Sequence, residues 1–456
     1  MRSKENVLSL YFCWLVLLGY IALTIACGKW SRHTVIKNDA AGYYVYLSSI
    51  FVYNDLMQCK FYPHLDSMYN PGDGVVYYAV QQNHETGNFY FKYNYGVALF
   101  EAPLFLLIHG FVNLSKLYPS DGYSAPYQLS VALSAVLFSF FALLLLRSFL
   151  LSYFSDKVVL ITLFIIACGT NFFAQVITQP GLSHTYLFFL YCAILYSTQK
   201  LYKTVELKYG LFLGVSLGWC LVTRSIDVFV CAIPLFWIYS QVNNLQDAAM
   251  LFKRHYKQMS LVALAIGGFI FIQMLYWKIT TNHWYFYTYR KEHFDFNNWQ
   301  IVNGLFSFRK GWFVYTPLAL LGFIGIYFVW KKKELRFYIL PITLYFLLTL
   351  YFVFCWWQWY YGGSFGCRVL VQSLALLALP MAALVEFVIS SGWRTRIVSA
   401  IVVLFFVGLN IFQTAQYAKG VIHWQKMNRD YYWKVFGKWS VSDDDKKLLL
   451  QTEELH

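Results

Sequence analysis

The chain of 456 residues is 59% hydrophobic and only 13% charged, and its mean hydropathy is +0.48. Ordinary soluble domains carry about 25% charged residues, so this composition excludes a water-soluble globular protein. The net charge of +14 is explained by Lys and Arg in the loops of a membrane protein, so nucleic acid is not expected as a partner.

Apolar runs of about 18 or more residues recur along the chain, which is the pattern of membrane-spanning helices. The runs are continuous and do not alternate with polar residues, so they exclude a β-barrel. We therefore expect an all-α polytopic membrane protein with roughly 11 to 13 transmembrane helices. The clearest candidates are residues 8–27, 96–114, 126–148, 157–177, 183–198, 258–280, 313–330, 337–355, 368–389 and 397–416.

The apolar stretch 208–241 differs from these because it carries Arg224 and Asp227 near its middle. It is too long for one crossing and short for two. We expect two short helices that meet near one face of the membrane.

The first apolar run is too long for the hydrophobic part of a signal peptide, so residues 1–27 are expected to form an uncleaved first transmembrane helix. Residues 28–95 are predicted to be a Tyr-rich outer loop, and the apolar spacing over 43–57 predicts a helix that lies in the membrane interface. The other expected parts are a transmembrane bundle (96–280), a second outer loop (281–312), a second bundle (313–416) and a polar C-terminal tail on the outer face (417–456).

Lys and Arg cluster in four loops that the positive-inside rule places in the cytoplasm, namely 200–208, 253–257, 331–336 and 393–396. The loop 356–367 is then on the outer face. Counting from an inner Met1 puts 115–125 and 178–183 inside as well, which conflicts with the basic loops. One re-entrant or interfacial segment would remove the conflict, and the candidates are 43–57 and the segment that contains Pro103.

Asp39 follows the first apolar run, in the sequence NDAAGYYVYL. An acid at the mouth of the membrane is well placed to take a proton from an acceptor hydroxyl. It could equally be the N-cap of a helix that starts at Ala40. His184 follows Pro180-Gly181 at a helix start, where a histidine is either functional or solvated at the interface.

Basic residues at two further places could meet an anionic ligand. Arg224 and Asp227 are three residues apart, so they form either a neutralised pair or an arginine that faces a phosphate. Arg309 and Lys310 lie in the second outer loop, against the positive-inside trend. They would bind either the phosphate of a lipid carrier or membrane lipid headgroups.

The stretch WWQWYYGGSFGCR (356–368) combines aromatic residues, glycines and an arginine. Its tryptophans suit a membrane-interface belt, but its glycines also allow the backbone to approach a ligand closely. Arg368 opens the next apolar run, where it needs an anionic partner. The nine cysteines include no CxxC pair and lie mostly in apolar runs, so neither a disulfide framework nor a metal site is expected.

These motifs occur in an order that resembles the GT-C superfamily of polytopic membrane glycosyltransferases, in particular the bacterial relatives of dolichyl-phosphate-mannose protein mannosyltransferases and of the aminoarabinose transferase. The resemblance rests on NDAAGYYVYL, GLSH, GVSLGWCLVTRSIDVFV, RKGWFVYTPLALLGFIGI and WQWYYGGSFGCR, which span most of the chain. It implies an inverting enzyme that moves a sugar from a polyprenyl-phosphate donor to an acceptor hydroxyl, on the outer face of the cytoplasmic (inner) membrane.

The resemblance also implies roles for individual residues. Asp39 would be the general base, in a family that often has an Asp-Glu pair where this chain has Asp39-Ala40, and Glu85 is the candidate second carboxylate. The donor phosphate would be bound by Arg224, Arg368, His184, Arg309 and Lys310. The substrates would be lined by Tyr43, Glu85, Trp359, Tyr360 and Gly363. Basic side chains can hold the phosphate without a metal, and no cofactor is therefore required. A divalent cation is the only cofactor that the resemblance still allows.

Two other functions fit parts of this pattern. A transporter or flippase of lipid-linked sugars would share the basic cavity and the aromatic lining but would need no base. An O-antigen-ligase or polymerase type of enzyme would have a large outer loop rich in Arg and His. The expected partners are a polyprenyl-phosphate sugar lipid and membrane lipids, and the sequence does not specify the acceptor.

Overall fold

The computed structural model describes residues 7–75, 77–239 and 245–450. This part of the chain is mostly helical, with one antiparallel hairpin of β1 (Val80–Gln82) and β2 (Phe89–Phe91). The first helices are α1 (Leu8–Cys27), α2 (Asp39–Phe51), α3 (Tyr62–Tyr69), α4 (Gly96–Ser115), α5 (Ala125–Leu150), α6 (Asp156–Gly169), α7 (Asn171–Thr178), α8 (Ser183–Lys203) and α9 (Leu207–Thr223). They are followed by η1 (Ser225–Cys231), α10 (Ala232–Tyr239), α11 (Leu245–Arg254), α12 (Tyr256–Thr281), α13 (Ile301–Phe306), α14 (Trp312–Tyr315), η2 (Pro317–Ala319) and α15 (Leu320–Lys331). The last are η3 (Lys333–Tyr338), α16 (Ile339–Phe354), η4 (Arg368–Leu370), α17 (Leu374–Ser390), α18 (Trp393–Ala418), α19 (Arg429–Val435) and α20 (Asp443–Lys446).

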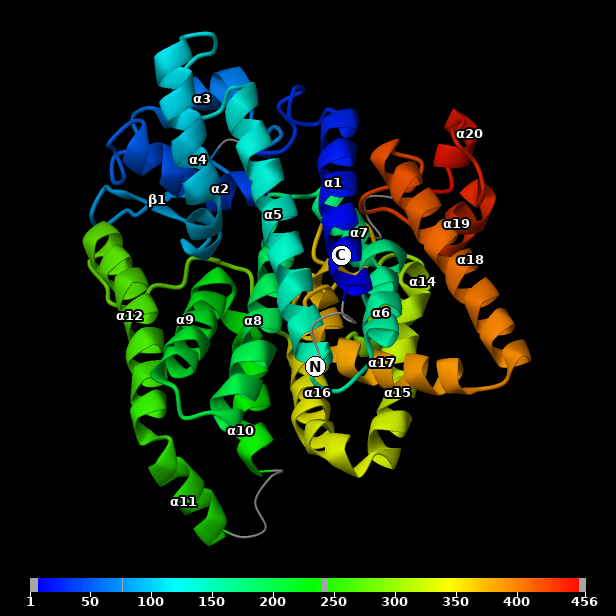
Figure 1. Ribbon diagram of the computed structural model, residues 1–456. Coiled ribbons are helices and arrows are strands. Elements are labelled where there is room, and N and C mark those ends of the chain that lie inside the picture. The colour runs from blue at the N-terminus through cyan, green and yellow to red at the C-terminus, as the bar shows by residue number, and fades with distance from the viewer. Residues whose placement is uncertain (1–6, 76, 240–244, 451–456) are drawn as a thin grey trace.

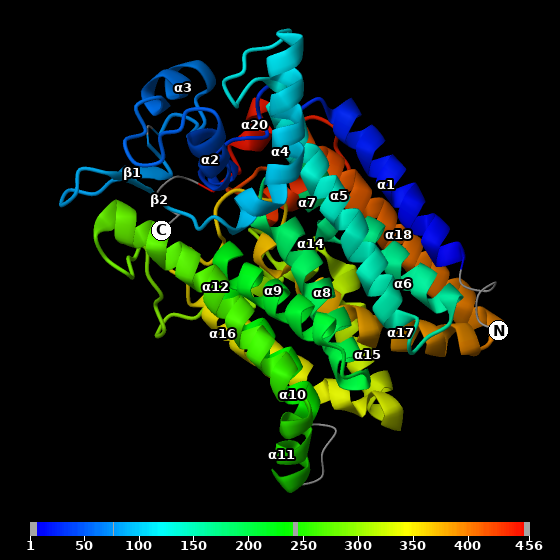
Figure 2. The same cartoon turned by 60° about the vertical axis from the view of Figure 1, so that its left-hand side comes forward.

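The long helices form a bundle, and the connecting segments gather at its two ends (Figure 1). The upper end in Figure 1 carries α2, α3 and the β-hairpin on one side and α19 and α20 on the other, and we call it the hairpin end. The opposite end carries α11 and the turn between α15 and α16, and we call it the basic end. The turned view in Figure 2 shows the same division.

Among the described residues, six helices are long and apolar enough to cross a membrane, namely α1, α4, α5, α12, α18 and the combined η3–α16. The bent pair of α6 and α7 makes a seventh if it is one span, and four further apolar helices are shorter than 18 residues. The expected class, an all-α polytopic membrane protein, is confirmed. These helices number eleven only when the bent pair, the four shorter helices and α4 are all counted, so the expected count of roughly 11 to 13 spans stays a prediction.

Two expected spans are broken helices. The single helix expected over 157–177 ends at Gly169 and restarts at Asn171 after a bend of 55°. Thr170 makes the break, because its backbone is extended and its hydroxyl accepts the Phe172 N–H at 3.3 Å as the N-cap of α7. The run 313–330 is divided at Pro317, which has no N–H to continue the helical hydrogen bonds.

The described part of the stretch 208–241, which ends at Tyr239, forms two short helical segments, as predicted, with Arg224 in extended backbone at the turn between them. Its first helix, α9, lies against α12 through Gly210, Gly214 and Gly218, which recur every four residues. A Cβ added at any of the three would come within 2.8 Å of an α12 atom. Small residues at this spacing let two membrane helices approach closely.

Helix α4 accounts for the conflict in the loop count. It begins at Gly96, which lies against Thr223 at the end of α9. The loop that follows α4 is bound to the first outer loop, where the Tyr69 hydroxyl donates to Asp121 Oδ2 at 2.5 Å. Figures 1 and 2 both show α4 rising beside α2 and α3 at the hairpin end. The loop that follows the Pro103-containing segment therefore lies at the same end of the bundle as residues 28–75 and 77–95.

Helix α2 confirms the helix predicted in the first outer loop but not its amphipathic character. Every residue from Ala40 to Ser49 is buried. Tyrosines on α2 reach neighbouring backbone, since Tyr44 donates to the Gly122 carbonyl and Tyr46 donates to the Tyr93 carbonyl at 2.8 Å. This helix therefore packs inside the hairpin end and does not lie on a membrane interface with one exposed face.

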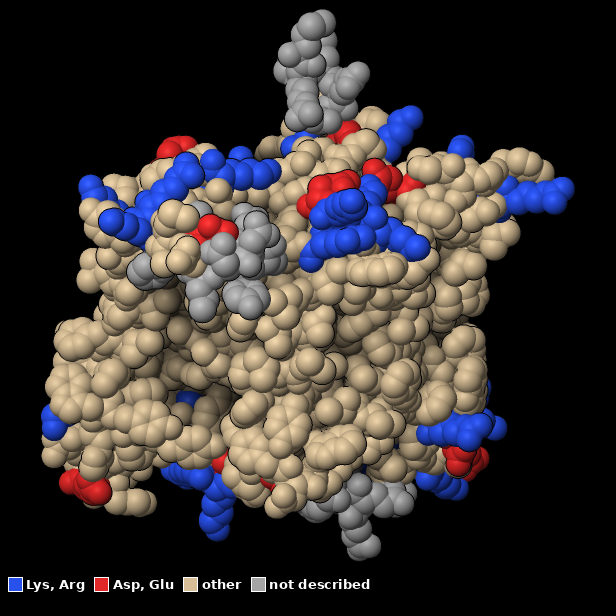
Figure 3. All heavy atoms as spheres, turned by 90° about the horizontal axis from the view of Figure 1, so that it is seen from below, with Lys and Arg blue, Asp and Glu red and all other residues tan. Residues whose placement is uncertain are grey.

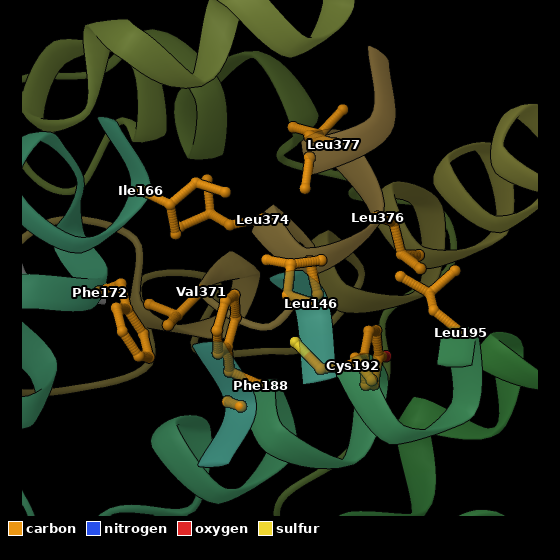
Figure 4. Close-up of a cluster of buried hydrophobic side chains, with 14 of the residues drawn as sticks. Leu146, Ile166, Phe172, Phe188, Cys192, Leu195, Val371, Leu374, Leu376 and Leu377 are labelled. Carbon is orange, nitrogen blue, oxygen red and sulfur yellow. The ribbon is translucent and has the colours of Figure 1, made fainter. Parts of the chain in front are cut away.

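The core of the bundle surrounds α17, whose side chains from Leu374 to Leu379 are fully buried. Figure 4 shows Leu374, Leu376 and Leu377 among side chains from α5, α6, α7 and α8. Protein interiors are packed as densely as organic crystals, so this contact fixes α17 within the bundle. The segment immediately before α17, which carries Arg368, is fixed with it.

The basic loops gather at one end of the molecule. Lys332, next to α15, forms an ion pair with Glu386 near the end of α17, and Lys203 lines a pocket together with Glu334. In Figure 3, which views the molecule from below, Lys and Arg side chains gather toward the upper and lower edges of the picture, with a broad uncharged surface between them. The basic loops thus share one end, and the segments 281–312, 356–367 and 417–450 lie toward the other (Figure 1).

Candidate active site

Asp39 is the first residue of α2 and lies among hydrogen-bond donors from distant parts of the chain. Tyr78 and Tyr93 donate to Oδ1 at 2.7 and 2.6 Å. Arg368 Nη2 donates to Oδ2 at 2.7 Å, and the side chains of this ion pair are only 13% and 16% exposed. The N-cap position of α2 is Asn38, so Asp39 is not the N-cap that the sequence left open.

The surroundings of Asp39 keep its carboxyl ionised. Burial by itself raises the pKa of Asp39, but the charge of Arg368 and the hydrogen bonds from Tyr93 and Tyr78 outweigh burial. The pKa of Asp39 is therefore held well below its usual range. A carboxylate in this state is a weak base as long as Arg368 stays in contact with it.

The β-hairpin positions the two tyrosines. Its register pairs Val80 with Phe91, and the Lys92 N–H donates to the Ala79 carbonyl at 2.9 Å, which brings Tyr78 and Tyr93 opposite each other. Neither the two tyrosines nor Lys92 belong to the site residues predicted from the sequence. The signal that could have found them is the alternation of aromatic and other residues after the turn at 83–88, where Phe91, Tyr93 and Tyr95 are separated by single residues.

A buried polar network lies beside the Asp39 cluster. His184 Nδ1 is 3.3 Å from Gln372 Oε1, and Gln372 Nε2 donates to Asp227 Oδ1 at 2.9 Å. Tyr191 donates to the same oxygen at 2.6 Å, and Arg224 Nη1 is 3.7 Å from Asp227 Oδ2. The network joins the start of α8, η1 and the segment before α17. The sequence analysis did not single out Gln372.

Arg224 and Arg368 retain unused donors. Their side chains are each 13% exposed, and in the described part of the chain Arg224 Nη1 and Arg368 Nε have no hydrogen-bond partner. Both arginines and Asp39 lie close enough to His184 for their charges to act on its ring. Buried N–H groups of a guanidinium that lack an acceptor favour the binding of an anion. The structure thus brings together four predicted residues, namely Asp39, His184, Arg224 and Arg368.

Lys310 is near Arg368 but is fully engaged. Its Nζ donates to the carbonyls of Ser364 and Trp424 and to the Ser364 hydroxyl, the last two at 2.6 and 3.2 Å. Burial, and then the neighbouring charges of Arg368 and Arg309, lower the pKa of Lys310. All three ammonium protons have acceptors, so Lys310 ties the 356–367 loop to the C-terminal tail in this structure and has none left for a phosphate.

Arg309 and the aromatic residues Trp359 and Tyr360 form one half-buried group. The Arg309 guanidinium lies 3.4 Å from the centre of the Tyr360 ring and 5.9 Å from that of Trp359. Its Nη2 is buried without a hydrogen-bond partner among the described residues. This cation–π group keeps one guanidinium edge available to an anion.

Tyr43, Gly363 and Glu85 have different positions. The Tyr43 ring lies 4.5 Å from that of Tyr93, and burial, followed by the Asp39 charge, raises the pKa of Tyr43 to about 12. A Cβ at Gly363 would lie 2.8 Å from the Trp424 ring, so this glycine lets the tail pack closely against the 356–367 loop. The Glu85 side chain is 68% exposed at the hairpin tip and pairs with His283 at 3.0 Å, so the structure does not bring it to Asp39.

The donor set around Asp39 fits a cation poorly. Both carboxylate oxygens accept hydrogen bonds, from Tyr78 and Tyr93 at Oδ1 and from Arg368 at Oδ2. In the part of the chain that the structure describes, no group of three or more His, Cys, Asp or Glu side chains could hold a metal ion. Divalent cations such as Mg²⁺ prefer oxygen ligands and are bound through carboxylates, of which this site offers one.

Neither a protein-family model nor a curated protein sequence matches this chain. Solved structures do match it. The Archaeoglobus fulgidus oligosaccharyltransferase in the apo form has a TM-score of 0.53 and 12% identity, over 98% of this chain and 60% of that one. The same enzyme tethered to an acceptor peptide with the NVT sequon has a TM-score of 0.53 and 11% identity, over 96% and 58%. The archaeal oligosaccharyltransferase AglB from A. fulgidus, in complex with an inhibitory peptide and a dolichol-phosphate, has a TM-score of 0.50 and 11% identity, over 96% and 59%.

Taken with the apolar helices, these similarities define a multi-pass membrane protein with a GT-C-like fold. The fold is similar to that of an archaeal oligosaccharyltransferase, and the chain spans about 60% of the length of that enzyme. The resemblance drawn from the sequence motifs is thereby confirmed at the level of the fold.

Proposed function

We propose that this protein is an inverting glycosyltransferase that moves a sugar from a polyprenyl-phosphate donor to an acceptor hydroxyl on the outer face of the cytoplasmic membrane. The observation that carries the proposal is the meeting of one carboxylate, Asp39, with two arginines that keep free N–H groups, Arg224 and Arg368. The similar fold of an oligosaccharyltransferase that was solved with a dolichol-phosphate supports a lipid-phosphate donor.

In the proposed reaction, the acceptor oxygen forms a bond to the anomeric carbon of the sugar while the bond from that carbon to the phosphate oxygen breaks. The acceptor proton goes to Asp39. The negative charge that develops on the departing polyprenyl phosphate is stabilised by Arg224 and Arg368, which are fixed before the reaction begins. These roles require no divalent cation.

Arg368 has two partners in this mechanism. In the structure it is paired with Asp39, which weakens the carboxylate as a base. A bound phosphate competes for the same guanidinium, and a shift of Arg368 toward it frees Asp39 Oδ2. The carboxylate is then a stronger base when a donor is bound.

The proposal is tested by the substitution Asp39→Asn. We expect vesicles that carry this variant to bind radiolabelled polyprenyl-phosphate hexoses like the wild type but to transfer the label at least about 100-fold more slowly, since the amide accepts no proton. Asp73→Asn, at an exposed acid of the same outer loop, is the matched control and should transfer normally. Transfer at the wild-type rate by Asp39→Asn would refute the role of Asp39 as the base. Movement of the lipid-linked sugar across the membrane by the wild type, without any sugar transfer, would favour a transporter.

A further inference from the structure

The second outer loop contacts both walls of the candidate site. On one side, Lys92 Nζ is 2.6 Å from Glu292 Oε1, and the Thr288 hydroxyl donates to the Lys92 carbonyl at 2.6 Å. On the other side, the Trp357 N–H donates to the His293 carbonyl at 3.0 Å. Residues 288–293 therefore bridge the β-hairpin and the loop 356–367.

Tyr289 lies in the middle of this bridge. Its ring centre is 6.0 Å from that of Tyr93, which binds Asp39, and 5.8 Å from that of Trp356. The Lys92 ammonium lies 5.3 Å from the Tyr289 ring and 5.5 Å from the Tyr93 ring, so one cation holds both rings.

The Tyr289 hydroxyl is available to a ligand. No hydrogen bond to it is formed within the described residues, although the side chain is half-buried. Burial, and then its neighbour Tyr43, raise the pKa of Tyr289, and the charges of Arg224 and Asp39 also act on it. Tyr289 is therefore a neutral donor whose ring lies beside Tyr93, the residue that binds Asp39, and within reach of the charges of Asp39 and Arg224.

We propose that Tyr289 hydrogen-bonds the sugar that is transferred, and that the Lys92–Glu292 ion pair positions it. The proposal rests on the proposed function. If Asp39 faces the acceptor and Arg224 faces the donor phosphate, the group between them is the sugar, whose hydroxyls accept hydrogen bonds from a phenol. A phosphate alone would use the arginines and would not depend on Tyr289.

The test compares two lipid probes, a polyprenyl phosphate and the same lipid carrying glucose, mannose, galactose or N-acetylglucosamine. Wild type should bind at least one sugar-bearing lipid more tightly than the bare phosphate. Tyr289→Phe should lower the affinity for that sugar-bearing lipid about tenfold, because one hydrogen bond to the sugar is lost. The affinity for the bare polyprenyl phosphate should stay unchanged. Tyr285→Phe, at an exposed tyrosine of the same loop, should change neither affinity.

The positioning role of the ion pair has a separate readout. Glu292→Gln should raise the KM for the sugar donor several-fold with little change in kcat. Glu292→Asp keeps the negative charge, so its KM should lie between those of Glu292→Gln and the wild type. Asp443→Asn, which breaks an exposed pair in the tail, should have no effect. A lower kcat at unchanged KM would contradict a positioning role.

The two hypotheses fail in different ways. If Tyr289→Phe weakens both lipids equally, or neither, the sugar contact is wrong while the proposed function stands. If wild type prefers no sugar-bearing lipid over the bare phosphate, the sugar contact is also wrong. If wild type binds none of the probes and Arg224→Gln changes nothing, the proposed function is wrong and this inference with it.

Discussion

At the scale of residues, the ion pair between Asp39 and Arg368 joins the first outer loop to the segment before α17. The pKa of Asp39 is lower in the folded protein than in the unfolded chain, so the carboxylate contributes stability above its unfolded pKa. That contribution is lost only as the pH falls through the lower, folded value. The contribution of Asp39 to the stability of the wild type should therefore not change in mild acid.

Removal of the arginine should reverse this behaviour. In Arg368→Gln the burial of Asp39 is no longer offset by the arginine, and Lys92 is the weaker cation that remains, so the pKa of Asp39 should rise. We expect a loss of about 3 kcal/mol of stability near neutral pH, since a buried charge is left unpaired. The acid limb of the pH–rate profile should move toward neutral pH. Thermal unfolding in detergent and transfer rates between pH 4 and 8 would measure both effects.

Arg394→Gln is the control for this substitution because Arg394 is exposed at the start of α18. It should leave the pH dependence of stability unchanged. An acid limb at the same pH in Arg368→Gln and in the wild type would show that the ion pair does not set the ionisation of Asp39.

The charged residues of the site could be predicted from the sequence, whereas the uncharged residues that hydrogen-bond to them could not. An ionisable residue in or next to an apolar run is energetically costly and is usually functional, so such residues could be found from the sequence. They are Asp39, His184, Arg224 and Arg368. Tyr78, Tyr93 and Gln372 could not be found in this way, because tyrosines are common throughout this chain and their partners lie far away in sequence. The packing role of Gly363 depends on Trp424 from the tail, which no local pattern indicates.

At the scale of elements, the contact between α9 and α12 depends on three glycines. We predict that Gly214→Leu destabilises the protein by about 3 kcal/mol, because the added side chain meets the α12 backbone at Val262 and cannot be accommodated by rotation. Gly267→Leu on α12 should be tolerated, since a Cβ there meets nothing within 4 Å. Thermal unfolding of the two purified variants makes the comparison. Equal stability of the two would contradict the close packing.

Periodicity and hydropathy located the helical segments but not their breaks. The run 157–177 is apolar throughout, and its break depends on a capping hydrogen bond of Thr170 that hydropathy does not register. Pro317 was a visible signal for the break within 313–330. The burial of α2 could not be predicted, because it depends on contacts with α4 and with the loop that follows α4.

At the scale of the whole molecule, the position of α4 predicts the sidedness of the loops. Ser120→Cys, just after α4, and Asn297→Cys, in the second outer loop, should both react with a membrane-impermeant maleimide in intact cells. Lys333→Cys and Arg394→Cys, at the basic end, should react only after permeabilisation, because basic loops stay in the cytoplasm. All four positions are exposed, whereas the described native cysteines are buried or half-buried. Labelling of positions 120 and 297 from opposite sides would contradict the proposed topology.

The central claim is that the arginines at the hairpin end bind a polyprenyl-phosphate-linked sugar. Native mass spectrometry of the protein purified in mild detergent tests it most directly. We predict a bound lipid with the mass of a polyprenyl phosphate, with or without a sugar, that is lost in the double variant Arg224→Gln/Arg368→Gln and kept in Arg394→Gln/Arg396→Gln at the opposite end. Identical bound lipids in both double variants would contradict the account, as would a wild type that carries only bulk phospholipid after polyprenyl-phosphate hexose is added.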